Sequence, residues 1–594
     1  MSQNSSYPIR SYGLIGNRAS AALVSPNGSV DWCCLPHPDS TSHFGTLLDS
    51  SLGGSFQAAP LGSFRSHQTY RERSAVLETH FETDTGKGIL TDWMPLDTGL
   101  EELPSVFREV HTIEGEITWR VYCHPRFDYG AHASEIEQLR HGFRFRGPKS
   151  EQICTLTCSQ SLRRISATPW IEAQLKLNAG ERAHLQWIWG RHRSLTPTPS
   201  IASTLKAWKG WAHECPPQNC PYAGPWHDTF VRSQICLKIL SLSSLGIPAE
   251  SITPFMDDPR LIWLKNAAQA AQVFSELNQL TDLSDVFETL GTILLRDSTD
   301  ELRPTYSLDA GKSHGDREWG ALPSHRKLHL TPYGQILLAL GEAAARIPSL
   351  KAQLTPNHWN RLSDLTEHVA QIWRRPDIPW NEPSARAEHF VHSKLACWAG
   401  LDSSIRLKGP QKTPQRWLDQ REILKQTILS QGYSSELGCF VSHFGSHECH
   451  ASWMEIPLRG LLPFDDPRIE SSIRFTQERL LEGVLVRNTT RLSHLFSNEE
   501  LDLAPSFQYA SCLARSGKLE QASDHLAELC TATGELQIWG SRIDRDTLKT
   551  SGNFPSSQVC LALMAAVLEV ARARSLRKSE NDDKQASYPG TLTR

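Results

Sequence analysis

The alternation of hydrophobic and polar positions divides the chain into two parts. Up to about residue 200, short segments alternate apolar and polar residues and are rich in Val, Ile, Thr and aromatic residues. A period of two over such short runs predicts β-strands, and the turn signals between them indicate an antiparallel β-sandwich. The clearest segments are Ser105–Thr112, Ile117–Cys123, Cys154–Cys158 and His184–Trp189, separated by turns such as Glu114-Gly115 and Ala179-Gly180.

One hairpin is predicted near the N-terminus. Ala21–Val24 and Ser29–Trp32 read as two strands, and Asn27-Gly28 between them supplies the positive φ that a tight hairpin turn needs.

After the Pro/Ser/Thr-rich stretch Ser194–Ser200, the hydrophobic period becomes that of a helix. Helices of 12 to 18 residues separated by long loops predict an all-α C-terminal domain. Gly432 is expected to end one of these helices as a left-handed cap. The predicted helices are Thr229–Leu245, Tyr333–Ile347, Gln415–Gln431, Lys518–Leu529 and Ser557–Ala573.

The resulting domain prediction has four segments. A β-sandwich domain covers residues 1–200, a linker 201–225, the helical domain 226–576, and a polar, disordered tail 577–594.

Charge and hydropathy exclude some classes of binding partner and of cellular location. The net charge is −4 and no basic block occurs, which argues against nucleic acid. No apolar run approaches the ~18 residues of a membrane span, and the N-terminus lacks the pattern of a signal peptide. We therefore expect a cytoplasmic protein whose 14 cysteines are reduced. The sequence leaves the oligomeric state open.

The stretch from Ser11 to Pro60 carries a family resemblance. Its run SYGLIGNRASAALVSPNGSVDWCCLPHPDS is similar to the YxLIGxxxxAALVxxxGSxDWxCxPxxDS opening of bacterial glycoside hydrolase family 15, the glucoamylases and trehalases. The resemblance covers roughly residues 8–575. It implies a β-sandwich followed by an (α/α)6 barrel with the active site at the mouth of the barrel.

An inverting glycosidase needs two carboxyl groups about 6.5–9.5 Å apart, one as general acid and one as the base that activates water. The block Trp380–Trp398 is similar to the family's GIWExRxxPxHFTxSKxxxW. Counted from His389-Phe390 without gaps, Glu382 falls on the general-acid glutamate. Trp380 lies one residue before the family's tryptophan and is a candidate for substrate binding.

The position of the general base is altered. Gly540–Pro555 matches the family's EEYDxxxGxxLGNFP segment, and the resemblance places Ser541 at the base position and Arg542 at the second glutamate. A serine hydroxyl cannot take a proton from water near neutral pH without a base of its own. Asp544 is the foremost substitute base, if the loop is rearranged. The carboxylates considered are Asp544, Asp546 and Glu535.

The block that grips the sugar ring is also altered. Asp257–Ala267 is similar to the family's NWDYRYCWLRDA, but its Arg-Asp pair becomes Lys265-Asn266. Lysine does not replace arginine at a bidentate site, and asparagine loses the charge. The substrate-binding candidates in this block are Asp258, Arg260, Trp263, Lys265 and Asn266.

A rival cluster lies in Ser442–His450, which holds three His, one Glu and one Cys, all residue types that bind metals. The resemblance makes this segment a loop at the barrel mouth, so we expect no metal and no cofactor. The chain also has no Gly-rich phosphate loop, and no GxSxG or GxGxxG motif in a strand-helix context.

Two hypotheses about function follow. The first is a glycoside hydrolase of the glucoamylase/trehalase type that acts on α-glucosidic bonds and binds a glucoside or an oligosaccharide. The second is a catalytically inactive relative that binds a carbohydrate or a protein. A carboxylate about 6.5–9.5 Å from Glu382 would favour the first.

Overall fold

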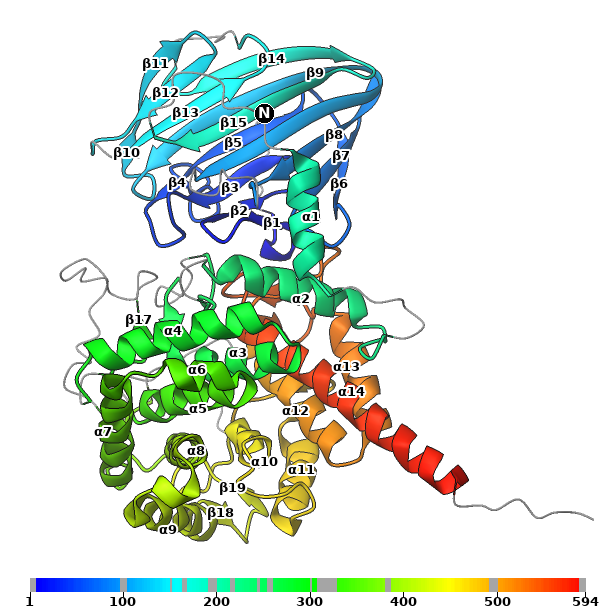
Figure 1. The fold of residues 1–594 in the computed structure, drawn as a ribbon. Coiled ribbons are helices and arrows are strands. Elements are labelled where there is room, and N and C mark those ends of the chain that lie inside the picture. The colour runs from blue at the N-terminus through cyan, green and yellow to red at the C-terminus, as the bar shows by residue number, and fades with distance from the viewer. Residues whose placement is uncertain are drawn as a thin grey trace, which may run out of the picture.

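The computed structural model describes residues 7–96, 104–149, 152–162, 168–190, 200–213, 220–242, 246–253, 260–299, 302–306, 328–379, 386–490 and 500–586, with the backbone only at 410 and 580–586. Figure 1 shows a domain of strands above a domain of helices, with one helix running between them. None of the helices in these ranges is long and apolar enough to cross a membrane.

The N-terminal domain is the antiparallel β-sandwich that the sequence predicts. Its two layers are β1-β2-β3-β5-β9-β14 and β6-β7-β8-β9-β15-β13-β12-β11, with β4 on β3 and β10 on β9. The strands are β1 Gly13–Gly16, β2 Ala21–Val24, β3 Ser29–Cys34, β4 Ser42–Phe44, β5 Gly54–Pro60, β6 Arg65–Tyr70, β7 Leu77–Glu82, β8 Gly86–Trp93, β9 Ser105–Phe127, β10 His132–Ala133, β11 Glu135–Leu139, β12 Gly142–Arg146, β13 Ile153–Cys158, β14 Ile171–Asn178 and β15 Arg182–Trp189. The predicted hairpin is confirmed as β2 and β3, with Gly28 at φ 71°.

Strand β9 belongs to both layers. Its first half pairs with β8 and β15, and its second half pairs with β5 and β14. The prediction of a turn at Glu114-Gly115 is therefore wrong. Gly115 adopts φ 68°, and a Cβ there would collide with the Thr85 carbonyl, so this glycine lets one strand of 23 residues bend from one layer into the other.

The C-terminal domain is helical, and its strands in the described ranges are two or three residues long. Two of these helices pack on several neighbours. Helix α5 packs on α3 and α8, and α14 packs on α2, α3 and α12. The helices are α1 Ile201–Trp211, α2 His227–Leu240, α3 Leu264–Glu276, α4 Leu280–Arg296, α5 Thr331–Arg346, α6 Pro348–Gln353, α7 Pro356–Ile372, α8 Val391–Lys408, α9 Gln415–Gln431, α10 Glu455–Leu458, α11 Pro467–Arg479, α12 Ala504–Arg515, α13 Leu519–Cys530 and α14 Ser557–Ala586. The short strands are β16 Ile262–Trp263, β17 Thr305–Tyr306, β18 Tyr433–Ser434, β19 Cys439–Phe440, β20 Leu481–Glu482, β21 Leu485–Val486, β22 Glu500–Asp502, β23 Arg542–Asp544 and β24 Thr550–Ser551.

Polar contacts join the two domains. The Trp32 indole donates to the Ile252 carbonyl at 2.7 Å, and the Arg232 guanidinium lies 3.5 Å above the Tyr70 ring. Helix α1 lies against the sandwich (Figure 1), where its Leu205 packs on a small apolar cluster of the strands.

Four expectations need correction. The segment 201–225, expected as a linker, contains α1, and the tail, expected to be disordered from 577, is helical through Ala586. Gly432 ends α9 at φ −92°, so it is not a left-handed cap. Cys439 and Cys449 are disulfide-bonded, contrary to the expectation of reduced thiols throughout.

Candidate functional site

The sugar-grip block meets the residues that directly follow the base block around a buried glutamate. Glu250 is 4% exposed and accepts hydrogen bonds from Asn266 Nδ2 at 2.8 Å and from Ser556 Oγ at 2.7 Å. Ser557 Oγ also donates to it, at 3.1 Å. Because Ser556 and Ser557 stand at the start of α14, this network fixes the first turn of the last helix against α3. Asn266 itself is 1% exposed, so its amide is committed to the network.

Lys265 and Trp263 lie together beside this network. Lys265 Nζ donates to Gln558 Oε1 at 2.8 Å and stands 4.9 Å from the centre of the Trp263 ring. Burial lowers the pKa of Lys265, against the opposing effects of the Glu250 and Asp502 carboxylates. The ammonium group and the aromatic ring remain the candidates for sugar contact in this block.

Arg260 serves the contact between the domains. Its guanidinium is 1% exposed and donates to the carbonyls of Pro38 and Ser40 in the sandwich, at 3.3 and 3.1 Å. These bonds give Arg260 the role of holding the sandwich loop against the helical domain. Asp258, its predicted neighbour in the site, lies outside the described residues.

Ser541 is tied to the loop that follows it. Its hydroxyl accepts a hydrogen bond from the Asn553 N–H at 2.9 Å, and its own N–H donates to the Asn553 carbonyl. Asp544 uses its carboxylate to close a turn, accepting from the Thr547 N–H at 2.7 Å and from the Thr547 hydroxyl at 2.6 Å. The hydrogen bond from the Thr547 hydroxyl is the main cause that lowers the pKa of Asp544. The other two substitutes considered, Asp546 and Glu535, are exposed.

Two carboxylates that the sequence analysis did not single out lie opposite the base block. Strand β22 pairs with β23 so that Asp502 faces Arg542. Glu500 and Asp502 lie on the same face of β22, and each has an oxygen 3.6 Å from the Arg542 guanidinium. The Asn488 side-chain amide also donates to Asp502. The spacing of two carboxylates at i and i+2 was the available signal, but only the strand register shows what they face.

Two histidines belong to the same region. Burial lowers the pKa of His450 to about 4, and the Asp502 carboxylate offsets part of that shift. Burial also lowers the pKa of His392 to about 3, assisted by His450. Both imidazoles are neutral near pH 7. Because His450 Nδ1 accepts from the Ser452 N–H at 3.0 Å, its proton is on Nε2.

Described residues on the two sides of the predicted general acid in the sequence pair with each other. Asp377 and Glu388 exchange backbone hydrogen bonds of 2.9 and 3.0 Å. Fully buried Lys394 donates to the Arg375 carbonyl at 2.6 Å. Burial raises the pKa of Asp377, and a hydrogen bond from Ser393 and the charge of Lys394 partly oppose this shift. Glu382 and Trp380 lie between these anchors, outside the described residues, and their roles stay predictions.

The histidine-rich loop at 442–450 packs against the segment that follows Glu382. Val391 N–H donates to the Ser442 carbonyl at 3.0 Å, and the rings of His389 and Phe444 stack at 5.8 Å. Cys449 is bonded to Cys439, so its sulfur is no thiolate ligand. The loop thus packs against residues 389–391, at the start of α8.

Comparisons with known proteins agree with the resemblance seen in the sequence. A family model described as "Trehalase-like, N-terminal" matches residues 1–157. A trehalase of Thermoplasma volcanium is 25% identical over 97% of this chain and 95% of its own length, and a trehalase of Mycobacterium tuberculosis is 25% identical over 98% and 92%. A bacterial glucoamylase, solved in complex with acarbose, has the same fold, with a TM-score of 0.69 at 10% identity over 96% of this chain and 94% of that one.

Proposed function

We propose that this chain, a trehalase- and glucoamylase-like protein of glycoside hydrolase family 15, hydrolyses the α-glucosidic bond of trehalose. The full-length similarity to curated trehalases supports trehalose ahead of starch-type oligosaccharides. It also favours hydrolysis over the alternative of a binding protein without catalysis. Glu382 is the general acid in this proposal, on the strength of its motif.

Asp502 is the proposed general base. The single observation that carries this assignment is the pairing of β22 with β23, which sets the Asp502 carboxylate opposite the block where the family keeps its base. Where the family has two adjacent glutamates, this chain has Ser541 and Arg542, and the carboxylates stand on the neighbouring strand. A carboxylate on β22 can accept a proton from water just as the family's glutamate would from the position of β23.

Asp502 is preferred over Glu500 for two reasons. Glu500 accepts a hydrogen bond of 2.9 Å from the Ser551 hydroxyl and is thereby held toward β24. Asp502, in contrast, acts electrostatically on both Lys265 and His450, so it faces the region where the sugar-grip block lies. Arg542 and Asn488 then fix the orientation of the carboxylate.

The other residues of the site take supporting roles. Lys265 and Trp263 offer a cation and an aromatic face to a sugar ring. Asn266, through Glu250, keeps the first turn of α14 in place, and Arg260 holds the adjoining loop of the sandwich.

Kinetics on trehalose and maltotriose test the proposal. Trehalose should be hydrolysed, and an inverting mechanism should release α-glucose and β-glucose in equal initial amounts by NMR. Asp502→Asn should lower kcat by ~10²–10⁴, as expected for loss of a general base, and Glu500→Gln on the same strand face is the matched control with a smaller effect. Full activity of Asp502→Asn would show that the base is elsewhere. Trehalose binding by calorimetry without any turnover would establish the binding-only alternative.

A further inference from the structure

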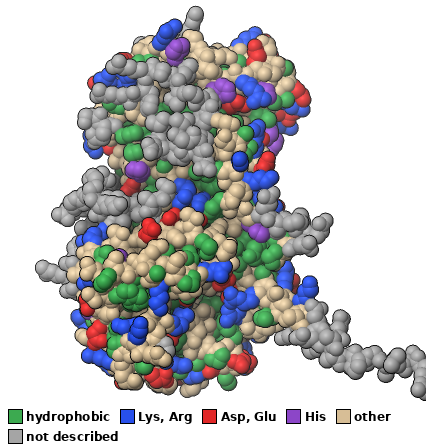
Figure 2. Space-filling view, viewed as in Figure 1, with side chains coloured by type: hydrophobic (Ala, Val, Ile, Leu, Met, Phe, Trp, Pro, Cys, Tyr) green, Lys and Arg blue, Asp and Glu red, His purple; other side chains and the backbone are tan. Residues whose placement is uncertain are grey.

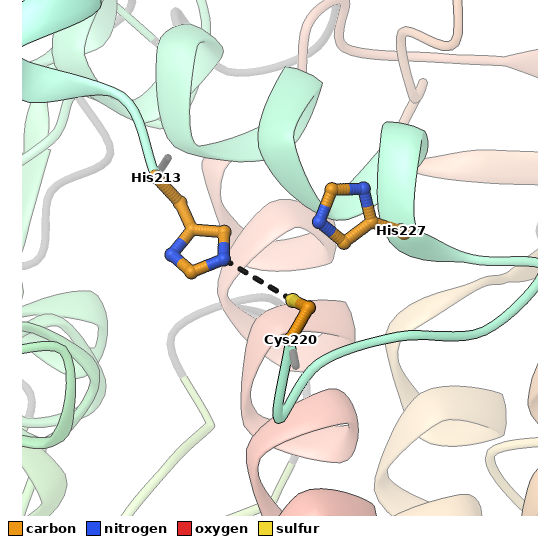
Figure 3. Close-up of side chains that lie close together, drawn as sticks. All are labelled: His213, Cys220 and His227. Atoms are coloured by element: carbon orange, nitrogen blue, oxygen red, sulfur yellow. Dashed lines mark hydrogen bonds between the residues drawn. The ribbon is translucent and has the colours of Figure 1, made fainter. Parts of the chain in front are cut away.

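A cluster of metal-ligand side chains lies at the joint between the two domains. His213 follows the end of α1, Cys220 lies in the connection, and His227 is the first residue of α2 (Figure 3). One ligand atom of each lies within 4.8 Å of the other two, and His213 Nε2 is 3.3 Å from Cys220 Sγ. None of the three belongs to the blocks that form the candidate active site.

We propose that His213, Cys220 and His227 bind a zinc ion. Zinc sits ~2.0–2.1 Å from imidazole nitrogen and ~2.3 Å from thiolate sulfur, so tetrahedral ligand atoms are ~3.4–3.6 Å apart. The distance of 3.3 Å between His213 Nε2 and Cys220 Sγ is within about 0.3 Å of this geometry. Since all three ligand atoms lie within 4.8 Å of one another, the widest separation has to close by at most about 1.4 Å on binding. On binding, the Cys220 thiol releases its proton to solvent and the thiolate takes up the metal.

His227 provides evidence independent of the spacing. Its Nε2 is buried and has no hydrogen-bond partner. Figure 3 shows this nitrogen on the side of the ring that faces His213 and Cys220. The other ring nitrogen, Nδ1, lies 3.4 Å from the Asp228 carboxylate. A carboxylate that accepts from Nδ1 leaves the lone pair on Nε2 and orients the ring, which is the usual arrangement of a zinc-bound histidine.

The surroundings suit a small, partly closed metal site. Cys220 is 8% exposed, and the Tyr222 and Phe230 rings pack on His213 with centroid distances of 4.9 and 6.1 Å. A cavity of about 470 Å³, lined partly by His213 and Tyr222, adjoins the cluster and offers an entry path. Three protein ligands leave a fourth position for water or another donor. Cys215 is near in the sequence but lies outside the described residues and is not counted in the set.

Bound zinc would brace the joint between the sandwich and the helices. The sandwich holds the end of α1 through Arg73, which donates to the His213 carbonyl at 2.7 Å. On the other side, Gln234 of α2 accepts from the His213 N–H at 3.1 Å. A metal shared by His213 and His227 would add a further tie between the end of α1 and the start of α2. This structural role is independent of the proposed hydrolase activity.

Metal analysis of the tag-free, full-length protein tests the site. Protein purified without added metal should contain stoichiometric zinc, and Cys220→Ser should lose it. Cys530→Ser is the matched control, because Cys530 is also a buried free thiol but lies on α13, outside the cluster. Replacement of zinc by Co²⁺ should give a thiolate charge-transfer band in the wild type and in Cys530→Ser, but not in Cys220→Ser. A chelator should lower the melting temperature of the wild type and of Cys530→Ser, but not that of Cys220→Ser.

The contrary results are equally clear. Wild-type protein that contains no zinc and binds neither Zn²⁺ nor Co²⁺ on titration would overturn the proposal, as would a cobalt band that persists in Cys220→Ser. Preferential binding of copper with an intense visible band would overturn the assignment to zinc.

Discussion

The Glu250 network predicts that restoring the family's residue at position 266 will destabilise this protein. In the wild type, Asn266 Nδ2 donates to Glu250 Oε2 over 2.8 Å, at a site where both side chains are almost fully buried. Asn266→Asp replaces that donor by a second carboxyl group. Two charges 2.8 Å apart repel by about 6 kcal/mol at an effective dielectric constant of 20.

Keeping one proton in the pair costs less than this repulsion. A protonated carboxyl can donate to Glu250 as the amide did. From the ordinary aspartate pKa of about 3.9, holding that proton at pH 7 costs about 4 kcal/mol, and at pH 5 about 1.5 kcal/mol. The folded-state pKa of the introduced carboxyl is raised, so the cost is absent below about pH 4 and grows as the pH rises.

Urea denaturation at pH 5, 6 and 7, followed by tryptophan fluorescence and circular dichroism, measures this dependence. The double variant Glu250→Gln, Asn266→Asp is the control, because it exchanges the carboxylate and the amide across the same contact and should recover most of the stability at pH 7. An equal loss of stability at pH 5 and pH 7, or a double variant as unstable as Asn266→Asp alone, would show that the buried carboxyl pair is not the cause.

Three further predictions follow from other contacts. Asp92→Asn should cost about 3–5 kcal/mol of folding stability, because it leaves the fully buried Arg108 guanidinium, now 2.6 Å from the Asp92 carboxylate, without its counter-charge. Lys87→Met breaks an ion pair on the exposed surface and should change folding stability by less than about 1 kcal/mol. An equal loss of stability in Asp92→Asn and Lys87→Met would contradict this difference between a buried and an exposed ion pair. In an Asp502→Asn background, Ser541→Glu should restore part of the trehalose turnover, because it returns a carboxylate to the family's base position. Glucose release measures the turnover, and no gain would argue against the alignment of Ser541 with that position.

Local patterns predicted the elements well where one face of a segment is buried. The helix expected at Tyr333–Ile347 is α5, Thr331–Arg346, since its apolar positions recur with the period of a helix that packs on two neighbours. The turn expected at Gly115 was wrong because the same positive φ that suits a turn also suits a bend within a strand.

The candidate site was only partly predictable from the sequence. The motifs identified Trp263 and Lys265, which do lie together and beside the first turn of α14. They could not identify Asp502, because its relation to Arg542 depends on strand register between segments 40 residues apart. The charges over the face drawn in Figure 2 are interspersed, as the small net charge suggests. Glu382 stays a prediction from its motif.

Strand β9 also constrains the order in which the chain can fold during synthesis. Its partners β5 and β8 precede it, but β14 and β15 follow it, and β15 ends at Trp189. Ribosomes add ~5–20 residues per second, so the roughly 60 residues between the ends of β9 and β15 take about 3–12 s to appear. During that interval β9 has one unpaired edge in each layer, which is a site for aggregation. We expect nascent chains that stop shortly after Phe127 to engage chaperones, and chains extended past Trp189 to release them.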